Sequence, residues 1–266
     1  MNRGNANGVA QHSDGRGEPD RVPAVVAVNE TGRSPYVLVC EHASNYMPAR
    51  YRGLGLAAPE LQRHIAWDIG AAPLARRLSA LIDAPLFLSG YSRLLIDCNR
   101  PPLAPTSIPV RSEATEIPGN QGLDNAERER RANTYFWPFQ NRIEQMLDAR
   151  MAAGQRTAVL GIHSFTPRFL GIERPWHAGV LYGKAATFAK ALLVRLAADP
   201  TLVVGDNEPY RVTLETDYTV PVHGDQRGID AALIEVRQDL LLTNEGVEEW
   251  ASRLSSVLVE MQQSAP

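Results

Sequence analysis

The feature that most constrains this chain is a series of short, largely apolar runs separated by longer amphipathic stretches. The clearest runs are residues 36–40 (YVLVC), 157–162 (TAVLGI) and 231–236 (AALIEV). Continuous apolar strands are typical of sheets that are covered on both faces, in which neighbouring strands run parallel. The pattern predicts an α/β fold with a mixed, mostly parallel sheet and helices on both faces.

The remaining elements follow from the same patterns and from turn residues. We expect further strands at 85–89, 93–97 and 177–183, and helices at 59–70, 71–83, 125–151, 185–199 and 245–263. Asp124 or Asn125 is a suitable N-terminal cap for the third helix. Residues 101–124 are rich in proline and predict a long loop, a kind of segment that is usually functional or mobile.

Composition sets the domain organisation and excludes several classes of function. Residues 1–33 are poor in large apolar groups and predict a flexible tail, followed by a single α/β domain at 34–266. A net charge of −3 argues against general nucleic-acid binding, and no apolar run approaches the roughly 18 residues of a membrane span. The N-terminus carries no apolar signal segment and the chain has 2 cysteines, so we expect a cytoplasmic protein without a disulfide framework.

Polar residues follow several of the predicted strands at the point where each one ends. Glu41 and His42 follow the first strand, and Asp97 ends the run at 93–97. His163 ends another apolar run, and Glu235 lies near the end of the last one. Because functional groups gather beyond the carboxyl ends of parallel strands, we expect these side chains to converge on one edge of the sheet.

Such a group of residues suits metal-assisted hydrolysis. Two imidazoles and a carboxylate hold Zn²⁺ while leaving a position open for water. The metal lowers the pKa of that water and polarises a carbonyl, and a separate carboxylate serves as general base. Arginine grips a substrate carboxylate through parallel hydrogen bonds. A cysteine nucleophile, Cys40 or Cys98 with a histidine, is the alternative chemistry.

Several motifs resemble the signatures of the zinc-carboxypeptidase-like superfamily, namely HSFTP from His163, DCNR from Asp97 and IEVRQD from Ile234. Within that superfamily, the chain from about Tyr36 onward is similar to the N-formylglutamate amidohydrolase family, and closest to its shorter branch. The stretches that carry this resemblance are VCEHASNYMP, HIAWDIGA, SRLLIDCNRP, GIHSFTP and GDNEPY. The resemblance implies the zinc-carboxypeptidase-like fold and a metal-dependent amidohydrolase.

The resemblance also implies roles for particular residues. His42 and His163 correspond to zinc ligands, Glu235 to the general base, and Asn99 and Arg100 to binders of the substrate carboxylate. The metal is expected to be one Zn²⁺ ion, although another divalent metal suits such ligands as well.

The third metal ligand is where this sequence departs from the carboxypeptidase pattern. Carboxypeptidases have a glutamate three residues after the first histidine, and this chain has Asn45 there, which is a poor zinc ligand. Asp68 in AWDIGA is the expected replacement, and Glu41 is its rival. On an extended backbone Glu41 points away from its neighbour His42, which favours Asp68.

Three further residues are candidates for substrate binding. Arg93 precedes the apolar run LLID, and His223 and Arg227 lie in the glycine-containing stretch PVHGDQRG. His64 is expected on a helix, four residues before Asp68 and on the same face.

These inferences lead to one expected reaction and two alternatives. The expected enzyme cleaves the amide bond of an N-formyl or other N-acyl amino acid, such as N-formyl-L-glutamate, and releases formate and the amino acid. Its partner is that small-molecule substrate, with no nucleic acid and no membrane, and the oligomeric state stays open. The alternatives are a related metal-dependent amidase acting on a peptide or peptidoglycan amide, and a non-catalytic protein that binds acyl amino acids.

Overall fold

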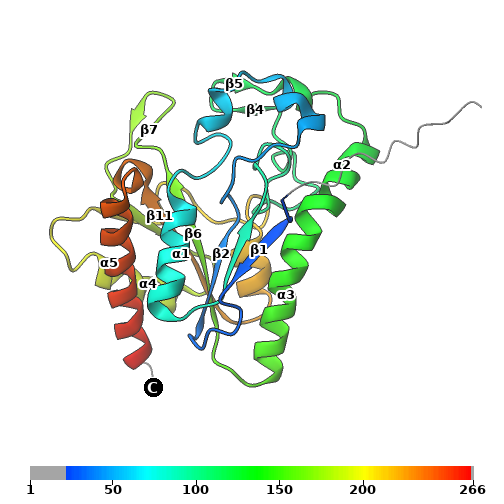
Figure 1. Ribbon diagram of the computed structural model, residues 1–266. Helices are drawn as coiled ribbons and strands as arrows, with labels where there is room; N and C mark the ends of the chain where they lie inside the picture. The colour runs from blue at the N-terminus through cyan, green and yellow to red at the C-terminus, as the bar shows by residue number, and fades with distance from the viewer. Residues whose placement is uncertain (1–21, 265–266) are drawn as a thin grey trace, which may run out of the picture.

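The computed structural model describes residues 22–264, and its centre is a seven-stranded sheet (Figure 1). In spatial order the strands are β1 (Val25–Val28), β3 (Leu86–Ser89), β2 (Tyr36–Cys40), β6 (Ala158–Phe165), β11 (Asp230–Arg237), β9 (Ala178–Leu181) and β10 (Val204–Asp206). The four central strands β3, β2, β6 and β11 are parallel to one another. β1 pairs antiparallel with β3, β9 pairs antiparallel with β11, and β10 is parallel to β9. The predicted mixed, mostly parallel sheet is confirmed.

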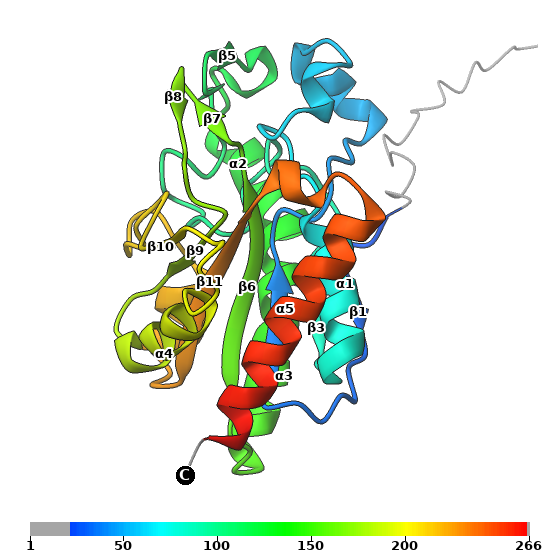
Figure 2. The ribbon, with the colours of Figure 1, turned by 90° about the vertical axis from the view of Figure 1, so that its left-hand side faces the viewer.

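Helices cover both faces of this sheet, as Figures 1 and 2 show. One face packs against α1 (Ala71–Ile82), α4 (Ala186–Leu196) and α5 (Asn244–Gln263), and the other packs against α3 (Trp137–Ala152). Alternate residues of β2 belong to the two cores: Leu38 lies with the first group of helices, and Val37 lies with α3. A strand buried in this way needs apolar side chains on both faces, which is why YVLVC reads as a continuous apolar run.

The helix expected at 125–151 begins where its capping residue predicts. The side chain of Asp124 accepts a hydrogen bond from the backbone N–H of Glu127, which satisfies an N–H group that has no partner within the helix. The helix comprises α2 (Asn125–Arg131), a π-helical segment (Ala132–Phe136) and then α3. The other expected helices at 71–83, 185–199 and 245–263 correspond to α1, α4 and α5.

Short elements lie above the carboxyl ends of the central strands (Figures 1 and 2). They include two small hairpins, β4 (Arg111–Ser112) with β5 (Thr115–Glu116) and β7 (Arg168–Phe169) with β8 (Ile172–Glu173). The 3₁₀ segments of the described chain are Ala49–Gly55, which joins two short turns across a kink, and Glu60–Gln62, Pro118–Asn120 and Gln238–Leu241. A second π-helical segment spans Thr219–Asp225. The loop expected at 101–124 therefore contains the first hairpin and one helical turn.

The predicted tail is wrong for Val25–Val28, which forms the edge strand β1. The polar composition of residues 1–33 as a whole concealed the apolar run VVAV, which pairs with β3 over four residues of register, from Val25 with Ser89 to Val28 with Leu86. The part of the predicted tail at residues 1–21 lies outside the described residues.

Two further local predictions are wrong. Residues 59–70 contain a single 3₁₀ turn, Glu60–Gln62, and the rest of that stretch is loop, so His64 does not lie on a helix before Asp68. Residues 93–97 form turns instead of a strand, and Leu94, Leu95 and Ile96 are buried in a separate core cluster. A short buried apolar run has no period that distinguishes a strand from buried turns. Within residues 22–264, no helix combines the length and the hydropathy that a membrane span requires.

Candidate active site

Side chains from different segments meet at the carboxyl edge of the sheet. His42 lies two residues beyond the end of β2, His163 lies in β6 and Glu235 lies in β11. Asp68 comes from the loop before α1, and its backbone N–H donates to the carbonyl of His42 at 2.9 Å. Ser164 helps to fix this loop, because its Oγ donates to the carbonyl of Ile69 at 2.7 Å. The convergence expected from the strand ends is therefore present.

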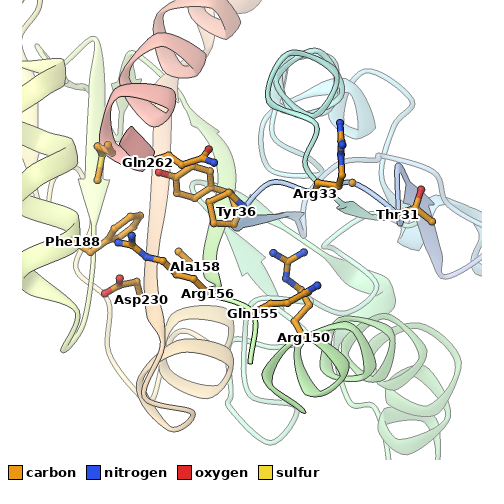
Figure 3. A pocket seen from close by; sticks show the side chains of 13 residues that line it. Thr31, Arg33, Tyr36, Arg150, Gln155, Arg156, Ala158, Phe188, Asp230 and Gln262 are labelled. Atoms are coloured by element: carbon orange, nitrogen blue, oxygen red, sulfur yellow. The ribbon is translucent and has the colours of Figure 1, made fainter. Parts of the chain in front are cut away.

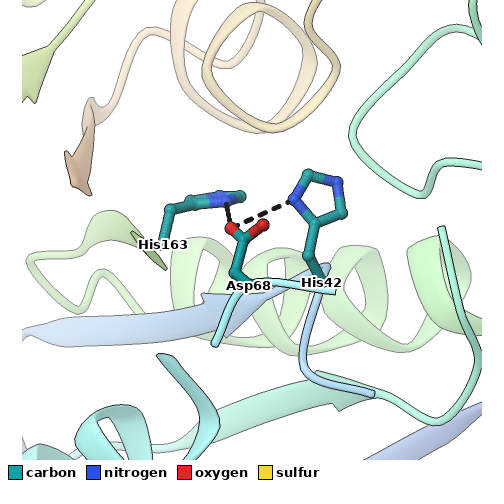
Figure 4. A group of neighbouring side chains, drawn as sticks. All are labelled: His42, Asp68 and His163. Atoms are coloured by element: carbon teal, nitrogen blue, oxygen red, sulfur yellow. Dashed lines mark hydrogen bonds and ion pairs between the residues drawn. The ribbon is translucent and has the colours of Figure 1, made fainter. Parts of the chain in front are cut away.

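The two imidazoles both turn Nδ1 toward one carboxylate oxygen, as Figure 4 shows. Asp68 Oδ2 lies 2.9 Å from Nδ1 of His163 and 3.3 Å from Nδ1 of His42. One potential ligand atom from each of the three side chains lies within 4.8 Å of the others, and all three side chains are buried. Two imidazole nitrogens and a carboxylate oxygen at this spacing fit a divalent metal site.

The outer nitrogen of each ring faces a second buried carboxylate. Nε2 of His42 lies 2.6 Å from Oδ1 of Asp97, and Nε2 of His163 lies 3.0 Å from Oε2 of Glu41. Burial opposes a charge on His163, yet Glu41 and Asp68 together raise the pKa of its imidazole well above its usual value. Burial also opposes the charge on Asp68, but His42 and His163 hold the pKa of this carboxyl far below its usual range. The carboxylates around the two imidazoles therefore favour a positive charge between the rings.

The rivals of Asp68 as third ligand lie elsewhere. The side-chain amide of Asn45 donates to the carbonyl of Leu61 and to Oε1 of Gln62, both at 3.0 Å. Glu41 faces the outer nitrogen of His163 instead of the shared space between the two Nδ1 atoms. Asp68 is therefore the carboxylate that the structure brings together with both histidines.

Arg93 joins two of the buried carboxylates. Its Nη2 and Nε donate to Oδ2 of Asp97 at 2.6 and 3.1 Å, and its Nη1 donates to Oδ1 of Asp68 at 3.3 Å. The residue lines the cavity, as a substrate-binding residue would, but its nitrogens are engaged by the protein. Sequence reasoning placed Asp97 in this group without a role, and only the fold shows that it binds His42 and Arg93 together.

Glu235 has the properties of a general base. It lines the same cavity, it is 5% exposed, and its Oε2 has no hydrogen-bond partner within the described structure. Burial and the nearby charge of Asp68 raise the pKa of its carboxyl to about 7, against the lowering effect of His163. A carboxylate with a pKa near neutrality is suited to accept a proton and to return it.

The cavity that contains these groups has a volume of about 520 Å³. Asn99 and Arg100 lie in its wall, as expected for substrate binders. The side-chain oxygen of Asn99 accepts from the backbone N–H groups of Tyr218 and Thr219 at 3.1 and 3.0 Å, and Arg100 donates to the carbonyl of Thr216. Five carboxylates and four arginines line the cavity, and an arginine is suited to grip an anionic group of a ligand; the arginines are Arg93, Arg100, Arg111 and Arg211.

Two other candidates from the sequence, His223 and Arg227, are not brought to this cavity or to the ligand group. His223 is buried, with Nε2 2.7 Å from Oε1 of Gln140, and burial lowers its pKa to about 4. Arg227 pairs with Glu144 and Asp148 on α3. His64 does line the cavity, but its Nε2 lies 3.4 Å from Oε2 of Glu113 and not beside Asp68.

Both cysteines lack the setting of a nucleophile. Cys40 and Cys98 are buried, and burial raises the pKa of each thiol far above its usual value. A nucleophilic cysteine requires a lowered pKa and access to substrate. The alternative cysteine chemistry is therefore not supported.

One cavity residue was missed by sequence reasoning although its motif was visible. Tyr210 ends the stretch GDNEPY and lines the cavity, and its hydroxyl accepts a hydrogen bond from Nη1 of Arg174 at 2.9 Å. The motif packs tightly against β9, since a Cβ at Gly179 would collide with the carbonyl oxygen of Glu208. Asn207 also accepts from the backbone N–H of Tyr182 at 3.0 Å. The motif is thus a rigid support for Tyr210.

The carboxylate of Glu113, between β4 and β5, connects separate segments of the outer wall of the cavity. Its Oε2 accepts from Nη2 of Arg63 at 2.6 Å, and its Oε1 accepts from the backbone N–H of Leu170 at 3.4 Å. Leu170 lies in the turn between β7 and β8. Three separate segments are therefore held together beside the cavity.

A second cavity, of about 470 Å³, lies at the amino ends of the central strands (Figure 3). Tyr36, Ala158 and Asp230, the first residues of β2, β6 and β11, contribute to its lining. It contains none of the site residues expected from the sequence.

Comparison with known families decides what kind of protein this is. Residues 34–242 match the family model of N-formylglutamate amidohydrolase, which is most of the chain. The chain belongs to the N-formylglutamate amidohydrolase family. As a member it is a hydrolase, and membership implies a small-molecule substrate. No relative among the curated proteins matches the chain.

Two solved structures are similar to this family member over nearly their whole length. The gene product Atu2144 from Agrobacterium tumefaciens shares 38% identity with a TM-score of 0.88, covering 91% of this chain and 96% of that one. N-formylglutamate amidohydrolase from Ralstonia eutropha JMP134 shares 18% identity with a TM-score of 0.66, covering 90% of this chain and 97% of that one. The second likeness shows that the amidohydrolase fold is shared.

Proposed function

We propose that this protein is a zinc-dependent amidohydrolase that cleaves N-formyl-L-glutamate, or a closely related N-acyl amino acid, into the carboxylic acid and the free amino acid. The observation that carries the proposal is the meeting of His42, Asp68 and His163 with the buried Glu235 in one cavity. Family membership supports amide hydrolysis as the reaction class.

The proposed metal ligands are Nδ1 of His42, Nδ1 of His163 and a carboxylate oxygen of Asp68. A divalent metal held there supplies Lewis-acid chemistry, which activates water at neutral pH and polarises the amide carbonyl. Zinc suits a set of two imidazoles and one carboxylate that leaves a position open. Asp97 holds the outer nitrogen of His42, so that its Nδ1 stays directed at the metal position.

Glu235 is the proposed general base. Its free Oε2 accepts a proton from the attacking water as the water oxygen bonds to the acyl carbon. Glu235 then returns that proton to the amide nitrogen, the carbon–nitrogen bond breaks, and the amino acid leaves with a neutral amine. Burial raises the pKa of this carboxyl toward neutrality, which favours both transfers near neutral pH.

The arginines in the cavity wall support a substrate that carries a carboxylate. Arg100 and Asn99 are the proposed partners of the amino acid carboxylate, and the backbone and side-chain contacts that anchor them hold them in place before substrate arrives. Preorganised groups lower the free energy that binding must spend on ordering the site. A cavity of about 520 Å³ suits a ligand as small as an N-acyl amino acid.

The direct test is an assay of the purified protein with N-formyl-L-glutamate, N-acetyl-L-glutamate, N-formyl-L-methionine and a peptidoglycan-type amide. We expect formate release that is greatest for N-formyl-L-glutamate, that stops with a chelator and that returns with Zn²⁺. Preference for the peptidoglycan-type amide would support the related amidase instead. Tight binding of acyl amino acids without turnover would support a non-catalytic binding protein.

A further inference from the structure

Glu41 occupies an unusual position for a carboxylate so close to a proposed metal site. Its side chain is completely buried, with 0% exposure, and it lies immediately before the proposed ligand His42. It does not join the group of ligand atoms formed by His42, Asp68 and His163. Instead its Oε2 lies 3.0 Å from Nε2 of His163, on the side of the ring away from Asp68. Burying a charged group is costly unless it has a purpose-built set of partners.

The partners of Glu41 come from two distant segments. Oε2 faces His163 in β6, and Oε1 accepts a hydrogen bond from the hydroxyl of Thr219, which begins the π-helical segment Thr219–Asp225. Thr219 is itself completely buried. Oε1 of Glu41 is therefore hydrogen-bonded to Thr219, and Oε2 lies within ion-pair distance of His163, so the side chain is held between two buried groups.

An imidazole that binds a metal through one nitrogen must carry its proton on the other. A carboxylate at that second nitrogen fixes the tautomer, holds the plane of the ring and makes the binding nitrogen a better donor. When a metal is bound at Nδ1 of His163, beside Asp68, the ring proton is on Nε2, and Nε2 lies 3.0 Å from the carboxylate of Glu41.

The two histidines differ in how their carboxylate partners are balanced. Asp97, which serves His42, also forms ion pairs with Arg93 and Arg100. The ion pair of Glu41 is with His163. A change of charge at Glu41 is therefore transmitted to His163, whereas a change at Asp97 is shared with two arginines.

We propose that Glu41 is the positioning residue of His163: it holds the proton of His163 on Nε2 and directs Nδ1 at the metal. This inference deepens the proposed function and rests on the metal site being real. Thr219 extends the arrangement, because it fixes the carboxylate of Glu41 from the other side. Glu41 contributes in this way without binding the metal itself.

The experiment measures zinc affinity of the full-length protein by competition with a chromophoric chelator. Four variants are compared with the unaltered protein: Glu41→Gln, Thr219→Val, His163→Ala and Glu260→Gln. Glu41→Gln keeps the size of the side chain and removes its charge, and we expect about 10- to 100-fold weaker zinc binding with one zinc still bound per chain at saturation. Thr219→Val should weaken binding less.

His163→Ala should lose the site, and Glu260→Gln, an exposed change on α5, should bind zinc like the unaltered protein. Circular dichroism of each variant establishes that it is folded. If Glu41→Gln does not fold, Thr219→Val answers the question, because unaltered zinc affinity in that variant overturns the inference.

A second measurement reports the proton directly. In the zinc-loaded, ¹⁵N-labelled protein, the Nε2–H proton of His163 should appear far downfield, as expected for a hydrogen bond to a carboxylate, and should be absent in His163→Ala. In Glu41→Gln it should move upfield. An unaltered resonance together with unaltered zinc affinity would overturn the role of Glu41.

Loss of zinc in Glu41→Gln as complete as in His163→Ala would overturn the inference too, because Glu41 would then be a ligand. The proposed function fails separately. If the unaltered protein binds no zinc, the metal mechanism is wrong and the role of Glu41 falls with it. If zinc binds and Glu41→Gln has no effect, the positioning role alone is wrong.

Discussion

Glu235 and His163 are direct partners in the parallel pairing of β11 with β6. Both side chains are buried and both line the larger cavity. Partner residues in neighbouring strands point to the same face of a sheet, so the register of two strands places the proposed base beside a proposed metal ligand. A shift of one residue in either strand would turn one of the two side chains to the opposite face.

Replacing Glu235 with glutamine should separate catalysis from metal binding. The amide cannot take a proton from water, so we expect kcat to fall by about 10²- to 10⁴-fold, the usual contribution of a general base. Zinc content should stay the same, because Glu235 lies outside the group of three ligand atoms. Steady-state kinetics and metal analysis of the same preparation check the two outcomes, and unchanged kcat would exclude Glu235 as the base.

The proposed ligands should fail together when the metal is removed or when one ligand is replaced. We expect His42→Ala, Asp68→Asn and His163→Ala each to lose zinc and activity, since an open site with three protein ligands tolerates no further loss. Chelation of the unaltered protein should also lower its unfolding temperature, because a metal that binds only the folded chain stabilises it. A variant that retains stoichiometric zinc contradicts the assignment of that ligand.

Asp97→Asn should weaken zinc binding although Asp97 is not one of the proposed ligands. The neutral side chain loses its ion pairs with His42 and Arg93, and we expect zinc affinity to fall by about 10- to 100-fold. We also expect the free energy of unfolding to fall by about 1–3 kcal/mol, because a buried hydrogen-bonded group loses its partner. Urea unfolding measures the second effect. The control is Asp239→Asn, a partly exposed carboxylate paired with Arg237, which should bind zinc normally.

Arg100 and Arg227 are both expected from the sequence as substrate binders, but of the two Arg100 lines the proposed substrate cavity. Arg100→Ala should raise KM for N-formyl-L-glutamate by about 10-fold or more, as expected for the loss of a hydrogen bond to a charged group. Arg227→Ala should leave KM unchanged, because Arg227 pairs with Glu144 and Asp148 on α3. The reverse result would return Arg227 to the substrate site and would remove Arg100 from it.

Gly179→Ala in β9 should disturb the cavity through the segment that carries Tyr210. The added Cβ collides with the carbonyl oxygen of Glu208 and displaces the segment that ends in Tyr210. Overpacking of this kind costs about 1–3 kcal/mol of stability. We expect that loss in urea unfolding, together with a lower kcat/KM, and normal kinetics would show that the placement of Tyr210 has no bearing on the reaction.

The sequence was most informative where a single pattern carries both structure and chemistry. The apolar runs that end in His42, His163 and Glu235 predicted strands, their burial and their meeting at one edge, because parallel strands must deliver their carboxyl ends together. Asp68 was reached only through the resemblance to a family, and the structure places it beside both imidazoles.

What the sequence did not predict depends on contacts between distant residues. The ion pairs of Arg93 with Asp68 and Asp97 come from the way residues 92–97 fold into turns, which an apolar run without a period does not reveal. The glycines around His223 suggested a ligand site, but that segment packs against Gln140 instead. Glu41 is a rival to Asp68 in the sequence because it is a carboxylate next to His42, and only the fold shows that it faces the outer nitrogen of His163.

Glu113 connects the segments of the cavity wall that do not belong to the central sheet. The reactive groups lie on or next to central strands, whose register fixes the position of each side chain in them. The outer wall consists of two hairpins and a loop, which the carboxylate of Glu113 holds together. Surface hairpins tolerate exchange and lengthening far better than paired central strands. Substrate specificity is therefore most readily changed by replacing or lengthening these two hairpins while Glu113 is kept. Such changes leave the reactive groups at the edge of the sheet in place.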